Sequence, residues 1–436
     1  MRSRSRLTLT AALLALPALA AAQTPPSFTM YVSIGDSLAA GFVSGALVET
    51  HQVNSVPALL ARQGGSPEFQ LPLVTQPGIP PELTLLGLVP APTIVRKAGL
   101  GSPRNSSLAR PYNNLAVPGA TLIDALQRVT DGGGLHDLIL RGLGTQVAQA
   151  VTLRPTFVTV WIGNNDVLGA AVNGRAIDGV TMTPAPAFRE AYQSLISTVK
   201  GTGATVVAAN LPDVTTIPFV TTVPPVVPNP LTGLPLVVNG TAIPLLGPAG
   251  PLSADSKVTL GATSLLAQGI GIPAILGGRA VISGGACLNC LPDEVVLDPA
   301  ELAFIKARVD ANNAAIDEIC RAAGVPVVDI HGLLDDFARS GRVVGGIPLT
   351  SSFLIGGIFS YDGVHPTDLG YAVTANEWIR VINANGGRLE EVDLEPYLRV
   401  GSASAAAPAT AVRPGVEFSP EAWQTLRELF PPVNQR

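Results

Sequence analysis

Residues 28–38 of this 436-residue chain read FTMYVSIGDSL. Phe28–Ile34 alternates in character and ends at Gly35, which predicts a β-strand followed by a turn. Ser37 stands where the strand gives way to the turn, so we expect it at the carboxyl edge of a sheet, where a nucleophile is exposed. A serine after Gly-Asp is also common in turns and at helix N-caps. The G-x-S-x-G elbow is not matched, because Ala39 replaces its second glycine.

Strand patterns and helical patterns alternate along the rest of the chain. The expected strands are Thr156–Ile162, Thr205–Asn210 and Val325–Asp329, and the expected helices are Pro186–Lys200 and Pro299–Ala323. In the longest helix Pro299 suits the first turn and Gly324 suits the C-cap. Strands that alternate with helices predict a parallel sheet covered on both faces, with ligands beyond the carboxyl ends of the strands.

A histidine base is needed to activate a serine hydroxyl, and the informative candidate is in residues 362–365, which read DGVH. With a glycine between them, Asp362 and His365 can fold back so that the carboxylate holds one imidazole nitrogen and frees the other for Ser37. The alternative is a capping turn before the helix expected over Leu369–Ile382. His51 and His136 have no partnered carboxylate motif of this kind.

Ester cleavage also needs hydrogen-bond donors aimed at the developing oxyanion. Residues 114–120 read NLAVPGA and offer the backbone N–H of Gly119. The strand Thr156–Ile162 leads into residues 163–166, GNND, whose amide side chains can donate. Taken separately, Gly119 is an ordinary turn residue and Asn165 an ordinary loop cap. The four elements follow one another in order at successive strand ends, and this order favours a catalytic role for them over a purely structural one.

In that order the chain resembles the SGNH/GDSL hydrolase family, whose blocks carry Ser, Gly, Asn and His. The resemblance implies that Ser37 is the nucleophile, His365 the base and Asp362 its orienting partner. It also implies an oxyanion hole formed by Gly119, Asn165 and the N–H of Ser37. The expected fold is a flavodoxin-like three-layer α/β/α sandwich with a central parallel sheet of about five strands. The expected function is a carboxylic ester hydrolase, an esterase or lipase, that needs no cofactor and no metal.

The spacing of the blocks is stretched by apolar insertions rich in Pro and Gly, over residues 49–110 and 215–299. We expect a signal peptide over 1–22, a hydrolase domain over 23–385, and a linker with a short helix over 386–436. The prolines of Thr215–Pro251 argue against any regular helix there. Apolar insertions around the site favour lipid or longer acyl esters over sugar esters. Carbohydrate acetylesterase activity, or a non-catalytic lipid-binding or adhesion role, is the alternative.

The N-terminus has the pattern of a secretory leader: Arg2, Arg4 and Arg6, an apolar run over Leu7–Leu19, and then small residues. We therefore expect a secreted or periplasmic protein, in a compartment that permits disulfides. A small structural disulfide between Cys287 and Cys290 is the favoured interpretation of their spacing, ahead of a redox motif or a zinc site.

Composition limits the partners. The formal net charge is −5 and 14% of residues are charged, with no basic cluster beyond the N-terminus, which argues against nucleic acid as a partner. The expected partners are a small-molecule or lipid ester substrate and, transiently, lipid surfaces. The sequence leaves the acyl chain, the alcohol and the oligomeric state open.

Overall fold

The computed structural model describes residues 25–87, 91–229, 234–398 and 415–433. The expected leader over 1–22 and most of the expected linker lie outside these described residues. The core is a parallel sheet in the order β1-β4-β5-β14, made of Tyr31–Gly35, Phe157–Trp161, Thr205–Ala209 and Val327–Val328. The predicted α/β class is therefore confirmed, with four regular strands where about five were expected.

The place of the fifth strand is taken by an extended segment beside β1. Asn114 forms a single parallel bridge with Ser33, and the N–H of Leu115 donates to the Ser33 carbonyl at 2.9 Å. This segment comes second in the chain but lies at the sheet edge next to the first strand, so the spatial order is that of a flavodoxin-like sheet. The segment is not a regular strand, because a single residue pair bridges it to β1.

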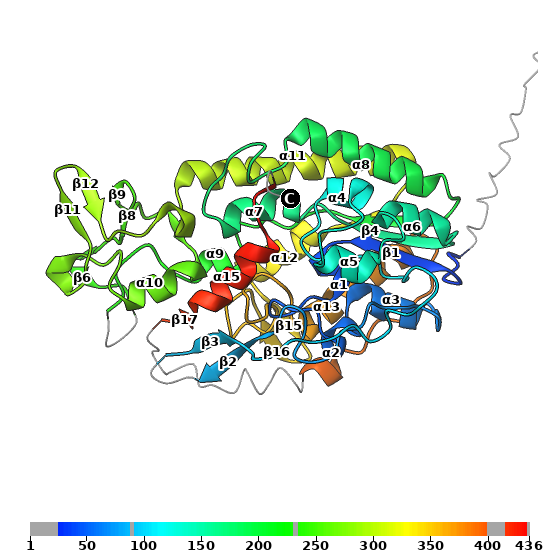
Figure 1. Ribbon diagram of the computed structural model, residues 1–436, viewed down its shortest axis with the longest axis horizontal. Coiled ribbons are helices and arrows are strands. Elements are labelled where there is room, and N and C mark those ends of the chain that lie inside the picture. Colours follow the sequence, from blue (N-terminus) through cyan, green and yellow to red (C-terminus); the bar gives the residue numbers. More distant parts are fainter. Residues whose placement is uncertain (1–24, 88–90, 230–233, 399–414, 434–436) are drawn as a thin grey trace, which may run out of the picture.

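Alternating side chains of the strands supply two separate apolar cores. Val32, Val158 and Val206 belong to one buried cluster, while Tyr31 and Phe157 belong to the other. The first core is covered by α4, α6, α8 and α11, which are Leu122–Gln127, Gln146–Thr152, Ala185–Lys200 and Pro299–Ala323. The second is covered mainly by α3, α7, α12 and α13, which are Val56–Gln63, Asn165–Val172, Ile330–Arg339 and Asp368–Ala384. Two apolar faces buried under helices give the three layers seen in Figure 1.

Helix α11 begins and ends as the sequence predicts, because its signals are local. Asp298 and Glu301 form a reciprocal capping box, Pro299 occupies the first turn, and Gly324 ends the helix in the left-handed region. The expectation that Thr215–Pro251 holds no regular helix is wrong at one turn. Helix α9 (Pro218–Thr221) forms there with Pro218 at its first position. Proline is tolerated at that position because the N–H that it lacks would have no partner within the helix.

The two insertions and the C-terminus build the additions around this core. The first insertion contains α2 (Glu49–Gln52), α3, and the antiparallel pair β2 (Leu83–Gly87) and β3 (Thr93–Arg96). The second forms the hairpin-rich lobe at the left of Figure 1, which contains β6 (Val237–Val238), β7 (Thr241–Ala242), β8 (Leu246–Gly247), β9 (Gly250–Pro251), β10 (Lys257–Val258), α10 (Thr263–Ala267), β11 (Val281–Ser283), β12 (Ala286–Leu288) and β13 (Val296–Leu297). None of the helices in the described parts of the chain has the length and apolar character that crossing a membrane requires.

The C-terminal residues return to the body of the molecule. Strand β17 (Glu417–Phe418) pairs in parallel with β3, and helix α15 (Pro420–Leu429) follows it at once. The helix buries Ala422 and Leu426, and Phe430 beyond its end is fully buried. This stretch is shown in red in Figure 1.

Candidate active site

Ser37 is the first residue of a one-turn helix, α1 (Ser37–Ala40), directly beyond β1. The N-cap is Asp36, whose Oδ1 accepts the N–H of Leu38 at 3.1 Å, so the Ser37 hydroxyl takes no part in capping. Glycine is required before this turn, because a Cβ on Gly35 would lie 2.7 Å from the Trp161 carbonyl oxygen. The GDS sequence thus sets a tight strand-to-helix turn with a serine at the carboxyl edge of the sheet.

Asp362 and His365 pair within one turn, in the arrangement that their spacing predicts. The imidazole Nδ1 lies 2.7 Å from the Asp362 Oδ2, and both side chains are fully buried. Gly363 has a φ of +69°, which lets the turn close. The other imidazole nitrogen, Nε2, is buried and has no hydrogen-bond partner among the described residues. The carboxylate therefore fixes the ring and leaves Nε2 for another group.

Asp362 is charged despite its burial. Desolvation on its own raises the pKa of this carboxyl, but the electrostatic interaction with His365 and the hydrogen bonds from His365 and Val364 outweigh it, so the net pKa is lowered. Its Oδ2 also accepts the N–H of Gly45 at 2.8 Å. An ionised carboxylate at this position stabilises the positive charge that a base acquires during the reaction.

Gly119 and Asn165 lie beside one another, as two donors to one oxyanion must. Asn165 is the first residue of α7, and its Nδ2 donates to the carbonyl of Ala120, next to Gly119, at 2.8 Å. Its neighbour Asn164 ties this corner to the nucleophile turn, since its Nδ2 donates to Asp36 Oδ2 at 2.8 Å. The ends of β1 and β4 and the turn at Gly119 therefore form one cluster.

The histidine turn is joined to the serine turn through α13 and Phe42. The Tyr371 hydroxyl donates to the Phe42 carbonyl at 2.7 Å and to the Ser37 carbonyl at 3.4 Å. The Phe42 ring meets the His365 imidazole edge-on, with centroids 4.9 Å apart. The structure thus brings Ser37, Gly119, Asn165, Asp362 and His365 to one edge of the sheet.

Several residues of this corner were not predicted. Asp36, Asn164 and Tyr371 act through partners far away in the sequence, and no local spacing indicates those pairs. The sequence shows no local carboxylate motif for His51 or His136, and both find a carboxylate partner through folding. His51 lies between two carboxylates, Asp368 at 2.8 Å and Glu82 at 3.1 Å.

His136 has a carboxylate partner as well. Its Nδ1 lies 3.2 Å from Asp131 Oδ2, in the loop before α5 (Leu135–Leu140). Elsewhere, Cys287 and Cys290 are joined by a disulfide, and Cys320 is free and buried. Within the described residues, no group of acidic, histidine and cysteine side chains is arranged to hold a metal ion.

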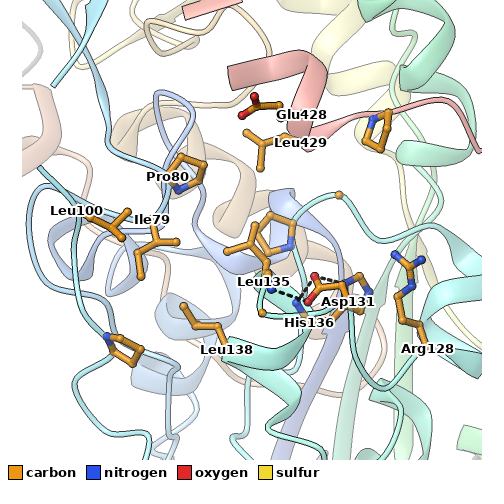
Figure 2. A pocket seen from close by; sticks show the side chains of 16 residues that line it. Ile79, Pro80, Leu100, Arg128, Asp131, Leu135, His136, Leu138, Glu428 and Leu429 are labelled. Carbon is orange, nitrogen blue, oxygen red and sulfur yellow. Dashed lines mark hydrogen bonds and ion pairs between the residues drawn. The ribbon is translucent and has the colours of Figure 1, made fainter. Parts of the chain in front are cut away.

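A cavity of about 700 Å³ opens beside Gly119. Figure 2 shows apolar side chains over much of its wall, including Ile79, Leu100 and Leu138, with the Asp131–His136 pair at one side. Leu429 and Pro431 from the C-terminus complete the lining, while Ser37 and His365 are not part of it.

A parallel sheet that carries a serine turn, an Asp-His turn and adjacent amide donors at its carboxyl edge is the arrangement of an α/β ester hydrolase. The chain belongs to the GDSL-like Lipase/Acylhydrolase family, whose family model matches residues 31–378. It is therefore a carboxylic ester hydrolase of the GDSL type, as the resemblance in the sequence implied.

Solved structures give more distant likenesses. A lipase/acylhydrolase from Enterococcus faecalis is 12% identical with a TM-score of 0.33, over 84% of this chain and 100% of that one. An acetyl-xylooligosaccharide esterase from Geobacillus is 12% identical with a TM-score of 0.35, over 84% of this chain and 99% of that one. The comparison with curated proteins found no match.

Proposed function

We propose that the chain is a secreted esterase or lipase that cleaves apolar esters through an acyl-enzyme on Ser37. His365 Nε2 takes the proton of the Ser37 hydroxyl as its oxygen attacks the ester carbonyl carbon. The tetrahedral intermediate collapses as His365 returns that proton to the departing alcohol. A water activated by the same imidazole then hydrolyses the acyl-enzyme. The observation that carries the proposal is the 2.7 Å pairing of Asp362 with Nδ1, while Nε2 has no hydrogen-bond partner in the described part of the chain.

The oxyanion of the intermediate would be held by the N–H groups of Ser37 and Gly119 and by the Asn165 amide. Support comes from the position of Asn165, whose Nδ2 already donates to the residue after Gly119. One hydrogen of that amide is engaged there, and the second remains for the oxyanion. Such donors act most strongly in a buried site, and Asn165 is fully buried.

The substrate class is inferred from the cavity beside Gly119. Its lining is mostly aliphatic and proline side chains, which suits the acyl chain or alcohol of an apolar ester better than a sugar. A position outside the cytoplasm is supported by the leader pattern at the N-terminus. Contact with lipid surfaces follows from the same apolar preference.

The nucleophile is tested with a fluorophosphonate probe, which labels an activated serine covalently. Labelling of the full chain should disappear in Ser37→Ala, while Ser340→Ala, which changes a serine after α12, should label as the parent does. Unchanged labelling of Ser37→Ala would disprove the assignment.

The substrate class is tested separately with p-nitrophenyl esters of increasing acyl length, with and without micelles. Turnover should be higher for C8 than for C2. A sharp preference for C2 would instead favour removal of acetyl groups from a polysaccharide.

A further inference from the structure

The candidate catalytic groups are closed off from solvent. Ser37 is 2% exposed and His365 is 0% exposed. A hydrolase of this type must bring an ester carbonyl into contact with both side chains. One element that packs against His365 and Gly119 is residues 415–433, which we call the C-terminal segment. It contains β17, α15 and the residues that follow the helix.

Phe430 of the C-terminal segment lies on the proposed base. Its ring stacks on the His365 imidazole with centroids 5.7 Å apart and 29° between the planes. The Phe430 carbonyl accepts a hydrogen bond from Asn173 Nδ2 at 3.0 Å, which fixes the end of the segment to α7. Phe430 is fully buried, so the aromatic ring fills space next to the imidazole.

The backbone of the C-terminal segment also lies against the proposed oxyanion hole. A Cβ built on Gly119 would be 2.6 Å from the Leu429 carbonyl oxygen. Figure 2 shows Glu428 and Leu429 entering the wall of the cavity beside Gly119. Leu429 and Pro431 line that cavity and Ser37 does not, so the C-terminal segment forms part of the cavity wall next to Gly119.

The C-terminal segment packs closely on the body, but among the described residues its strand pairing is with β3 and not with the central sheet. Strand β17 pairs with β3 through Glu417 and Phe418, and the N–H of Phe418 donates to Thr263 Oγ1 at 2.8 Å. Leu426 of α15 is buried in the same apolar cluster as Phe430. Withdrawal of the segment would therefore uncover these apolar side chains but leave the pairing of the strands that carry the site intact.

We propose that the C-terminal segment is an autoinhibitory cover. In the docked state it blocks Ser37 and His365, and its withdrawal exposes them and joins them to the cavity beside Gly119. This inference rests on the proposed function of Ser37. It predicts that the rate of reaction at Ser37 is limited by the fraction of molecules with the segment withdrawn.

The test is the second-order rate constant of fluorophosphonate labelling in the full-length chain. Phe430→Ala removes the ring that stacks on His365. Leu426→Ala removes apolar contacts of α15 with the core and so weakens the docking of the helix. Both should label at least about tenfold faster than the parent, because each raises the withdrawn fraction. Gln424→Ala on the exposed face of α15 is the matched control and should label at the parent rate. Thermal unfolding monitored by circular dichroism verifies that each variant is folded.

A reversible lock provides the opposite perturbation. Thr93 and Glu417 are register partners of β3 and β17, so the double variant Thr93→Cys with Glu417→Cys can tie the C-terminal segment down by a disulfide. The oxidised form should label at least about tenfold more slowly than the reduced form. The parent protein, labelled under the same oxidising and reducing conditions, is the control for any effect of the native disulfide between Cys287 and Cys290.

The outcomes separate the two proposals. Equal labelling of Phe430→Ala and the parent, or of the locked and unlocked forms, overturns the autoinhibitory cover and leaves the catalytic role of Ser37 intact. Labelling that persists when Ser37→Ala is added to Phe430→Ala overturns the role of Ser37 itself.

Discussion

Replacement of Asp362 by asparagine perturbs the most densely bonded group of the site. The carboxylate accepts hydrogen bonds on both oxygens. Its Oδ2 takes His365 Nδ1 at 2.7 Å and Gly45 N–H at 2.8 Å. Its Oδ1 takes the N–H groups of Val364 and His365, both at 2.8 Å, and the Ser360 hydroxyl at 3.2 Å. Asp362→Asn keeps the shape but turns one acceptor oxygen into a donor.

The magnitude follows from that count. If the amide nitrogen replaces Oδ1, the N–H groups of Val364 and His365 lose their acceptor, and if it replaces Oδ2, the N–H of Gly45 does. Each bond to a charged group contributes about 1.5–3 kcal/mol, so the free energy of unfolding should fall by roughly 1.5–6 kcal/mol. If the amide donates to Nδ1, the imidazole proton moves to Nε2, and His365 can no longer accept from Ser37. The kcat should then fall by about 10⁴-fold.

The assays are urea unfolding followed by tryptophan fluorescence and steady-state hydrolysis of p-nitrophenyl butyrate. Ser360→Ala is the control, because it removes the 3.2 Å bond to Asp362 and the acceptor of the Ser44 N–H at 2.9 Å but keeps the charge. It should cost about 1–2 kcal/mol and change kcat only a few-fold. A kcat of Asp362→Asn within tenfold of the parent would refute the orienting role. An equal loss in Ser360→Ala would place the effect in a loosened turn.

Asn165→Ala should lower kcat by about 10²–10³-fold with little change in KM, measured by steady-state kinetics. Burial lowers the pKa of His51, but the hydrogen bonds that its ring donates to Asp368 and Glu82 outweigh it and raise the pKa to about 9. Protonated His51 therefore contributes its full stabilisation below its unfolded pKa of about 6.5. Roughly 2–3 kcal/mol of the free energy of unfolding is lost as the pH rises to 9. Urea titrations at increasing pH should show this loss in the parent and a smaller one in His51→Gln. Gly363→Ala should lower Tm, because its Cβ would lie 2.9 Å from the Phe219 nitrogen at a φ of +69°.

The elements that the sequence predicts well are those whose signals lie within a few residues. Helix α11 begins at Pro299 and ends at Ala323, as expected, because its caps are neighbours in the chain. The Asp362–His365 pair was predictable for the same reason, since a three-residue separation with a glycine between allows one turn to join them. The position of Ser37 followed from a strand pattern and the turn after it.

The remaining parts of the site depend on contacts between distant residues. Asp36 meets Asn164 across 128 positions, and Gly45 meets Asp362 across 317. No periodicity or spacing records such pairs, because tertiary packing alone brings them together. The same limit explains His51, whose two carboxylates come from separate elements.

The two apolar insertions contact both the C-terminal segment and the histidine turn. Strand β3 of the first insertion pairs with β17, and Thr263 of the second insertion bonds to Phe418. Also from the second insertion, the N–H of Phe219 donates to the Gly363 carbonyl at 2.8 Å and supports the histidine turn. The insertions therefore build the surface on which the C-terminal segment docks and also support the base that the segment covers. If that cover is autoinhibitory, the insertions act on the reaction through the docked state, and loosening either one should raise the labelling rate of Ser37 without a change at Ser37 itself.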